Sequence, residues 1–125
     1  MTNILLFVTV TALFTTILGT NPGINYTFAQ EAVSIAPGSS NPSATEFYVP
    51  PEITVPSGTT VTWTNDDSTI HTVTEGTPGG AGATPAFDSS IIAPAGTWEN
   101  TFDTAGDFDY YCTLHPFMTG KVTVT

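Results

Sequence analysis

The chain has 125 residues, with 11 acidic side chains, one lysine and no arginine, and its formal net charge is −10. This charge argues against a nucleic-acid binder, because contact with phosphates needs a basic face, and against a polybasic membrane-surface protein. The length is enough for one domain. The single cysteine excludes an internal disulfide and any dinuclear site that needs two cysteines from one chain.

The first 29 residues are predicted to be a cleaved export signal or a retained N-terminal anchor, outside the folded domain. Ile4–Leu18 carries no charge and is almost entirely apolar or threonine, a length typical of a secretory signal and short for a membrane span. A small-residue site, Thr27-Phe28-Ala29, precedes Gln30. Residues 30–125 are therefore predicted to form an exported, periplasmic or otherwise extracytoplasmic domain. Its membrane contact would come only through residues 1–29 if they stay attached.

The rest of the chain consists of short runs of alternating or β-branched residues separated by turn residues, which predicts strands. No segment after the N-terminal one shows a useful helical period. Six to eight short strands predict an all-β fold, an antiparallel β-sandwich. In chain order the predicted strands are 52–55, 60–64, 70–74, 97–102, 108–112 and 121–125, with shorter segments at 33–35 and 87–93.

Gly76–Thr84 is a glycine-rich loop, predicted to be the most flexible part of the domain. It lacks the Lys-Ser/Thr pair and the following helix of a phosphate-binding loop, so we assign it no such role.

One segment, Cys112–Met118 (CTLHPFM), holds most of the residues that carry metal chemistry. It contains the only cysteine, one of two histidines and the only methionine besides the initiator. A thiolate, two imidazoles and a weak thioether make a trigonal site with a long axial ligand, which suits copper cycling between Cu(I) and Cu(II). Ligands from one tight loop cannot surround a metal alone, so His71 must come from a neighbouring strand. The predicted ligands of a single copper ion are His71, Cys112, His115 and Met118.

Zinc is the chemical alternative, because it also accepts cysteine and histidine. It gains little from a thioether, so Met118 favours copper. A lone cysteine or methionine is usually a packing residue, but here both share one loop with His115 at ligand spacing.

The 112–118 loop, the aromatic-rich strand before it and the upstream VTWTN…HTV segment (61–73) resemble the cupredoxins, small type 1 blue copper proteins of the plastocyanin and amicyanin kind. The resemblance covers about Glu52–Thr125, and the short spacing from His115 to Met118 is closest to amicyanin. It implies a Greek-key β-sandwich with the copper at one end, the same four ligands and one-electron transfer.

The sequence departs from that pattern beside His71. Thr72 stands where plastocyanin and amicyanin commonly carry an asparagine that helps to pin the cysteine loop. The hydroxyl of Thr72 and the side chain of Asn65 are the two candidates for that role, and the sequence leaves the choice open. Ile70 replaces the proline of amicyanin, and the longer glycine-rich loop (76–84) is placed to reach the metal end. These departures leave the openness of the copper site undecided.

The edge of the His115 ring is the predicted electron port, and its apolar neighbours Leu114, Pro116 and Phe117 form the predicted docking patch. The large aromatic residues are predicted to be core residues and not redox relays. These are Trp63, Trp98, Tyr110 and Tyr111.

The acidic residues near the predicted site have two interpretations. They steer a basic redox partner towards the protein, or they simply keep an exported protein soluble. The residues concerned are Asp66, Asp67, Asp107 and Asp109.

The predicted function is a single-electron shuttle between a donor and an acceptor redox protein, and not an enzyme. Two alternatives stay open: a single-copper oxidoreductase acting on a small molecule such as a nitrogen oxide at an open copper, and copper storage or delivery. Because His71 and His115 are both assigned to one metal, a separate three-histidine catalytic copper is excluded within one chain.

Overall fold

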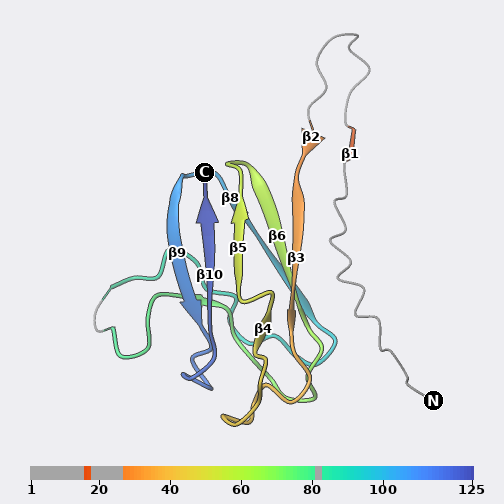
Figure 1. Ribbon diagram of the computed structural model, residues 1–125, viewed down its shortest axis with the longest axis vertical. Coiled ribbons are helices and arrows are strands. Elements are labelled where there is room, and N and C mark those ends of the chain that lie inside the picture. Colours follow the sequence, from red (N-terminus) through yellow and green to blue (C-terminus); the bar gives the residue numbers. More distant parts are fainter. Residues whose placement is uncertain (1–15, 18–26, 81–82) are drawn as a thin grey trace, which may run out of the picture.

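The computed structural model describes residues 16–17, 27–80 and 83–125, and the described chain is all β (Figure 1). Along β6 every second side chain is buried, and β5 follows the same rule, because successive side chains of a strand point to opposite faces of the sheet. In chain order the strands are β1 (Thr16–Ile17), β2 (Thr27–Phe28), β3 (Gln30–Ile35), β4 (Tyr48–Val49), β5 (Glu52–Val55), β6 (Thr59–Asn65), β7 (Thr74–Glu75), β8 (Thr97–Phe102), β9 (Gly106–Tyr111) and β10 (Thr119–Val124).

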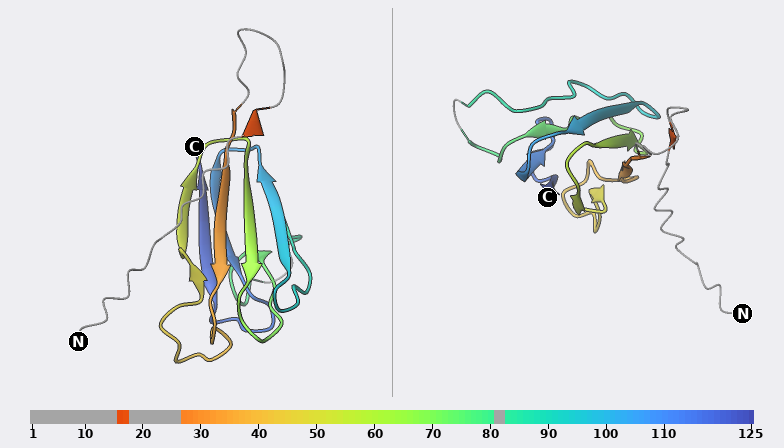
Figure 2. Two further views of the ribbon diagram at one scale, coloured as in Figure 1. Left: turned by 90° about the vertical axis from the view of Figure 1, so that its right-hand side faces the viewer. Right: turned by 90° about the horizontal axis from the view of Figure 1, so that it is seen from above.

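Eight of these strands form two four-stranded sheets, in the orders β4-β3-β6-β8 and β5-β10-β9-β7. The sheets face each other as two layers (Figure 2), and their inner faces share one hydrophobic core. Trp63 of β6 meets Tyr110 of β9 across this core, with ring centroids 5.5 Å apart. The predicted β-sandwich is therefore confirmed, and both Trp63 and Tyr110 are core residues as expected.

The strand directions differ in part from the antiparallel expectation, because each sheet contains one parallel pair. β3 runs parallel to β6, and β5 runs parallel to β10. A parallel pair needs a crossover between its strands, and here the chain changes sheet before it returns. Alternation along a strand reports which face is buried but carries no information on the direction of its neighbour.

The predicted strand at 70–74 is mostly irregular. Only β7 is a strand there, while His71 makes an isolated bridge with Ile92. Residues 71–74 are buried without alternation, because this segment lies inside the end of the sandwich and is covered from more than one side. The β-branched residues at 72–74 are buried, as their composition predicts. The predicted strand conformation is wrong for most of the segment.

The first residues of the glycine-rich loop, Gly76 and Thr77, lie beside β9 and the start of β10. The Gly76 N–H donates to the carbonyl of Asp109 at 2.8 Å. Thr77 borders a hollow of about 350 Å³ together with Glu52 and Lys121. That this loop reaches the metal end therefore stays a prediction.

Most of the predicted export segment (1–29) lies outside the described residues, so its cleavage stays a prediction. Within it, β1 and β2 pair antiparallel as a separate two-stranded sheet. β3 begins at Gln30, where the sequence places the start of the mature domain. Among the described residues, no helix has the length and hydropathy needed to span a membrane.

Candidate metal centre

Cys112 follows directly after β9, and the loop from 112 to 118 leads into β10 at one end of the sandwich. Three backbone hydrogen bonds close this loop. The His115 N–H donates to the carbonyl of Cys112 (3.3 Å), the Met118 N–H donates to that of His115 (2.9 Å), and the Cys112 N–H donates to that of Met118 (3.1 Å). The three predicted ligands of the loop are thus linked to one another through their own backbone.

His71 comes from the segment that follows β6, which two sets of hydrogen bonds hold in place. The His71 N–H donates to the carbonyl of Ile92 at 3.2 Å, and the Ile92 N–H donates back at 2.8 Å. The buried amide of Asn65 donates to the carbonyls of Thr69 (2.8 Å) and Ile92 (3.0 Å). Asn65 therefore fixes the path of the chain towards His71.

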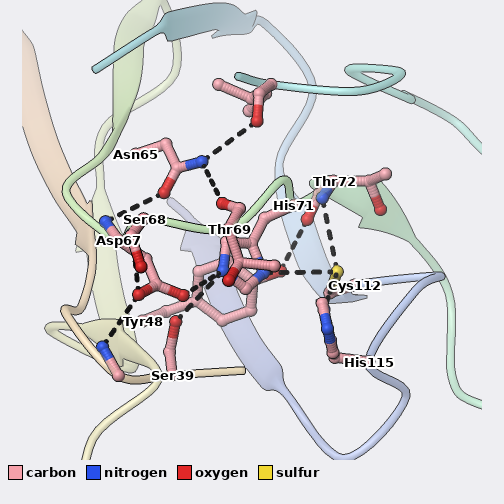
Figure 3. A network of polar contacts seen from close by, with 12 residues as sticks. Ser39, Tyr48, Asn65, Asp67, Ser68, Thr69, His71, Thr72, Cys112 and His115 are labelled. Carbon is pink, nitrogen blue, oxygen red and sulfur yellow. Dashed lines mark hydrogen bonds and ion pairs between the residues drawn. The ribbon is translucent and has the colours of Figure 1, made fainter. Parts of the chain in front are cut away.

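The structure brings three of the four predicted ligands together (Figure 3). The Sγ atom of Cys112 lies 3.7 Å from Nδ1 of His71 and 3.6 Å from Nδ1 of His115. With metal–nitrogen and metal–sulfur bonds of about 2.0 and 2.3 Å, a trigonal metal would separate sulfur from nitrogen by about 3.7 Å. The two sulfur–nitrogen distances therefore fit a single metal ion. Met118 is fully buried in the same loop, and its role as an axial ligand stays a prediction.

Thr72 holds the cysteine loop in place. Its backbone N–H donates to the Sγ of Cys112 at 3.3 Å. Its hydroxyl accepts a hydrogen bond from the Thr113 N–H at 2.9 Å. Of the two candidates from the sequence, Thr72 is thus the residue that pins the cysteine loop, while Asn65 holds the opposite segment.

The surroundings of Cys112 favour the thiolate that a metal requires. Burial raises the pKa of the thiol, but hydrogen bonds from His71, the Thr72 N–H, His115 and the Leu114 N–H outweigh it and lower the pKa to about 6. A thiolate is therefore available at neutral pH.

Asp67 is a site residue that sequence reasoning misplaced among the surface acids. It is 6% exposed, and its Oδ2 lies 2.7 Å from Nε2 of His71. Burial raises the pKa of Asp67, but hydrogen bonds from His71, the Gly38 N–H and the Ser68 N–H outweigh this effect. The pKa of Asp67 therefore lies below its ordinary value. Burial lowers the pKa of His71, but its contacts with Cys112 and Asp67 raise it above its ordinary value. In sequence, Asp67 looks the same as its exposed neighbour Asp66, so no local signal separated them.

The rim of the site is apolar where it meets solvent. His115 is half-buried, and its ring lies beside that of Phe117, with centroids 6.0 Å apart. Leu114 is 44% exposed and Phe117 is 38% exposed. Two further exposed side chains, Ile70 and Ile91, are the chain neighbours of the bridged residues His71 and Ile92.

Comparisons with known proteins agree with this geometry. Residues 38–125 match the model of copper binding proteins of the plastocyanin/azurin family. An amicyanin of Paracoccus versutus is 39% identical over 77 residues, which span 62% of this chain and 57% of that protein. Amicyanin-alpha of Methylorubrum extorquens is 36% identical over 98 residues, which span 77% of this chain and 81% of that protein.

A solved structure described as a purple cupredoxin from Nitrosopumilus maritimus superposes with a TM-score of 0.69. It is 35% identical and covers 75% of this chain and 98% of its own. The match to the family model covers more than half of the chain and includes all four predicted ligands. The chain belongs to the plastocyanin/azurin family of copper-binding proteins.

Proposed function

We propose that this protein is a one-electron carrier whose single copper ion is held by His71, Cys112, His115 and Met118. The observation that carries the proposal is the cluster of three donor atoms, with the thiol sulfur 3.6 and 3.7 Å from two imidazole nitrogens. A copper ion held by this set would supply one-electron chemistry between Cu(I) and Cu(II). Membership of the plastocyanin/azurin family supports the same function.

The protein holds the donor atoms in a geometry that needs little change during transfer. Hydrogen bonds fix the thiol through the Thr72 N–H, and they fix the His71 segment through Asn65 and Ile92. Donors that are fixed before the reaction do not have to be reorganised during it. This favours a carrier, which gains speed from a constant geometry, over a copper-delivery protein, which must release its metal.

Electrons enter and leave through the ring of His115. This ring is half-buried at the rim of the site, whereas the His71 ring is fully buried. The exposed apolar side chains of Leu114 and Phe117 flank it, and exposed apolar groups that gather in one place mark docking surfaces. We assign this rim, together with Ile70 and Ile91, as the docking surface for a redox protein partner.

The partner is proposed to be basic, and the protein to work outside the cytoplasm. The net charge of −10 creates a negative field around the chain and steers positively charged partners during encounter. Exposed acids such as Asp66 lie on the surface that a partner meets, whereas Asp67 is buried beside His71. The apolar, uncharged N-terminal segment supports the extracytoplasmic location.

The test is a visible and EPR spectrum of the full chain after Cu(II) is added, with Cys112→Ser and Met118→Ala in parallel. We expect an intense thiolate-to-copper band that is absent in Cys112→Ser and shifted in Met118→Ala. Thr104→Ala, at an exposed residue in the turn before β9, is the control and keeps the band unchanged.

Two outcomes contradict the proposal. A colourless protein that binds zinc tightly indicates a structural metal site on a β-sandwich. A copper band that shifts when small anions are added indicates an open copper that reacts with small molecules, and not a closed carrier.

A further inference from the structure

The imidazole of His71 uses its two nitrogens on opposite sides. Nδ1 faces the Sγ of Cys112 at 3.7 Å, on the side of the metal site, while Nε2 lies 2.7 Å from Oδ2 of Asp67 (Figure 3). The side chain of His71 is fully buried, and that of Asp67 is 4% exposed. An ionised carboxylate only accepts hydrogen bonds, so Nε2 carries a proton towards Asp67. Nδ1, which donates to the Cys112 thiolate while no metal is bound, would present its lone pair to a bound metal.

Asp67 is itself fixed by the backbone around it. Its Oδ1 accepts hydrogen bonds from the Gly38 and Ser68 N–H groups, both at 2.9 Å. Its own N–H donates to Oδ1 of Asn65 at 3.0 Å. These contacts leave Oδ2 directed at His71, and they compensate the cost of burying a charge. The anion behind His71 is therefore part of the fold and not a chance surface contact.

The other histidine of the site has a different environment. Among the described residues, the His115 ring has one hydrogen-bond neighbour, the Sγ of Cys112, and its ring packs against Phe117. One imidazole thus has an anion behind it, and the other has solvent and an aromatic ring. The two histidines therefore have different roles. His71 links the site to a negative charge, whereas His115 lies where an electron can be exchanged with a partner.

We propose that Asp67 is a positioning residue that orients His71 towards the copper and, through its negative charge, biases the site towards Cu(II). A carboxylate hydrogen-bonded to a ligating imidazole fixes the ring and makes it a stronger electron donor. A nearby negative charge also favours the metal ion of higher charge. The inference rests on the proposed copper site and assigns to this chain the residue that tunes it.

The test is the reduction potential of the full-length, copper-loaded Asp67→Asn variant at fixed pH and salt. The asparagine keeps one oxygen for the Gly38 and Ser68 N–H groups and replaces the carboxylate charge beside His71 by a neutral amide. We expect the affinity for Cu(II) to fall about tenfold or more relative to that for Cu(I). For one electron, a tenfold change equals a rise of about 59 mV in the potential.

The neighbouring residue offers a matched control. Asp66→Asn changes the net charge by the same amount, but Asp66 is exposed and its carboxylate accepts from the Ser34 hydroxyl. We expect the ratio of its Cu(II) affinity to its Cu(I) affinity to stay within about twofold of the wild-type ratio, because water and salt screen an exposed charge. A purely structural role of Asp67 would lower the unfolding temperature of Asp67→Asn and leave its potential at the level of Asp66→Asn, which overturns the inference.

A second measurement needs no variant. In the diamagnetic Cu(I) form of the wild type, ¹⁵N NMR is expected to show the His71 ring proton on Nε2, far downfield and slow to exchange. A proton on Nε2 that exchanges rapidly with solvent and is not shifted downfield would overturn the inference even if Asp67→Asn fails to fold, because a His71 that binds copper through Nδ1 carries its proton on Nε2 with or without Asp67. Failure of the proposed function is distinguishable, since the wild type would then show no thiolate-to-copper band at all.

Discussion

The hydroxyl of Thr72 accepts a hydrogen bond from the backbone N–H of Thr113 at 2.9 Å, so the residue after His71 is tied to the residue after Cys112. The two hydroxyls also lie 3.2 Å apart. This contact joins the two segments that supply donor atoms from different parts of the chain. A side chain with one oxygen and a methyl group thus performs, in this protein, the role that an asparagine amide commonly has at this position.

Thr72→Val tests this link, because valine keeps the shape of threonine and removes the hydroxyl. The Thr113 N–H then loses its acceptor, which is expected to lower the free energy of unfolding by about 1–3 kcal/mol. The copper-loaded variant should also lose its metal to a chelator faster than the wild type. Urea unfolding of the apoprotein and the rate at which the copper band disappears check both effects. Thr72→Ser keeps the hydroxyl and is the control, and equal losses in the two variants would contradict the assigned role.

Asn65 offers a test of the segment that carries His71. Asn65→Asp keeps an oxygen for the Asp67 N–H but places a carboxylate oxygen next to the carbonyls of Thr69 and Ile92, where the amide now donates. Asn65→Ala only removes the contacts. Because buried acceptors that face each other repel, we expect Asn65→Asp to be the less stable variant, with a loss above about 3 kcal/mol. Thermal unfolding of the two apoproteins at neutral pH decides the order, and the reverse order would contradict the donor role of the amide.

The sequence predicts the positions of most strands and the ligand residues of the site better than it predicts the residues that surround these ligands. Cys112, His115 and Met118 are three residues apart in one loop, so local spacing is enough to group them. His71 follows by elimination, because it is the only other histidine. Asp67 could not be found this way, since its burial depends on the Gly38 N–H, which belongs to a loop 29 residues away. The parallel strand pairs were missed for the same reason, as they join segments that are distant in the chain.

Gly120 provides a test of how β9 and β10 fit together beneath the metal loop. Gly120 lies opposite Tyr110 in the strand pair, and a Cβ on it would lie 2.7 Å from Cε2 of the buried Tyr110 ring. Glycine inside a strand often marks such a close approach. Gly120→Ala is expected to lower the free energy of unfolding by about 1–3 kcal/mol or more, as overpacked cores do. Thr119→Ala, at an exposed position of the same strand, should change it far less, and equal losses would contradict this account.

The lowered pKa of Cys112 predicts how the apoprotein responds to pH. A thiol whose pKa falls from 9.0 to about 6 on folding contributes stability that is complete above the unfolded pKa and is lost as the pH falls through about 6. The raised pKa of His71 acts with the opposite sign, since its contribution is lost as the pH rises through the folded value. Thiolate absorbance near 240 nm, taken as the difference between wild type and Cys112→Ser, isolates the cysteine. Its midpoint is expected near pH 6, and a midpoint near 9 would show that the hydrogen bonds do not outweigh burial.

Electron self-exchange tests the His115 rim without knowledge of the natural partner. Two copies that meet at the rim bring their copper sites together, and exposed Leu114 lies beside His115 there. Leu114→Glu places like charges opposite each other, which is expected to slow self-exchange at least about tenfold, because such contacts cost several kcal/mol. Thr104→Glu makes the same change of net charge in the turn before β9, at the opposite end of that strand from the metal loop, and should slow self-exchange much less.

Since each copy carries a net charge of −10, the wild-type rate should also rise with ionic strength. NMR line broadening in mixtures of the Cu(I) and Cu(II) forms measures all of these rates, and an equal slowing by both variants would place the exchange surface away from His115.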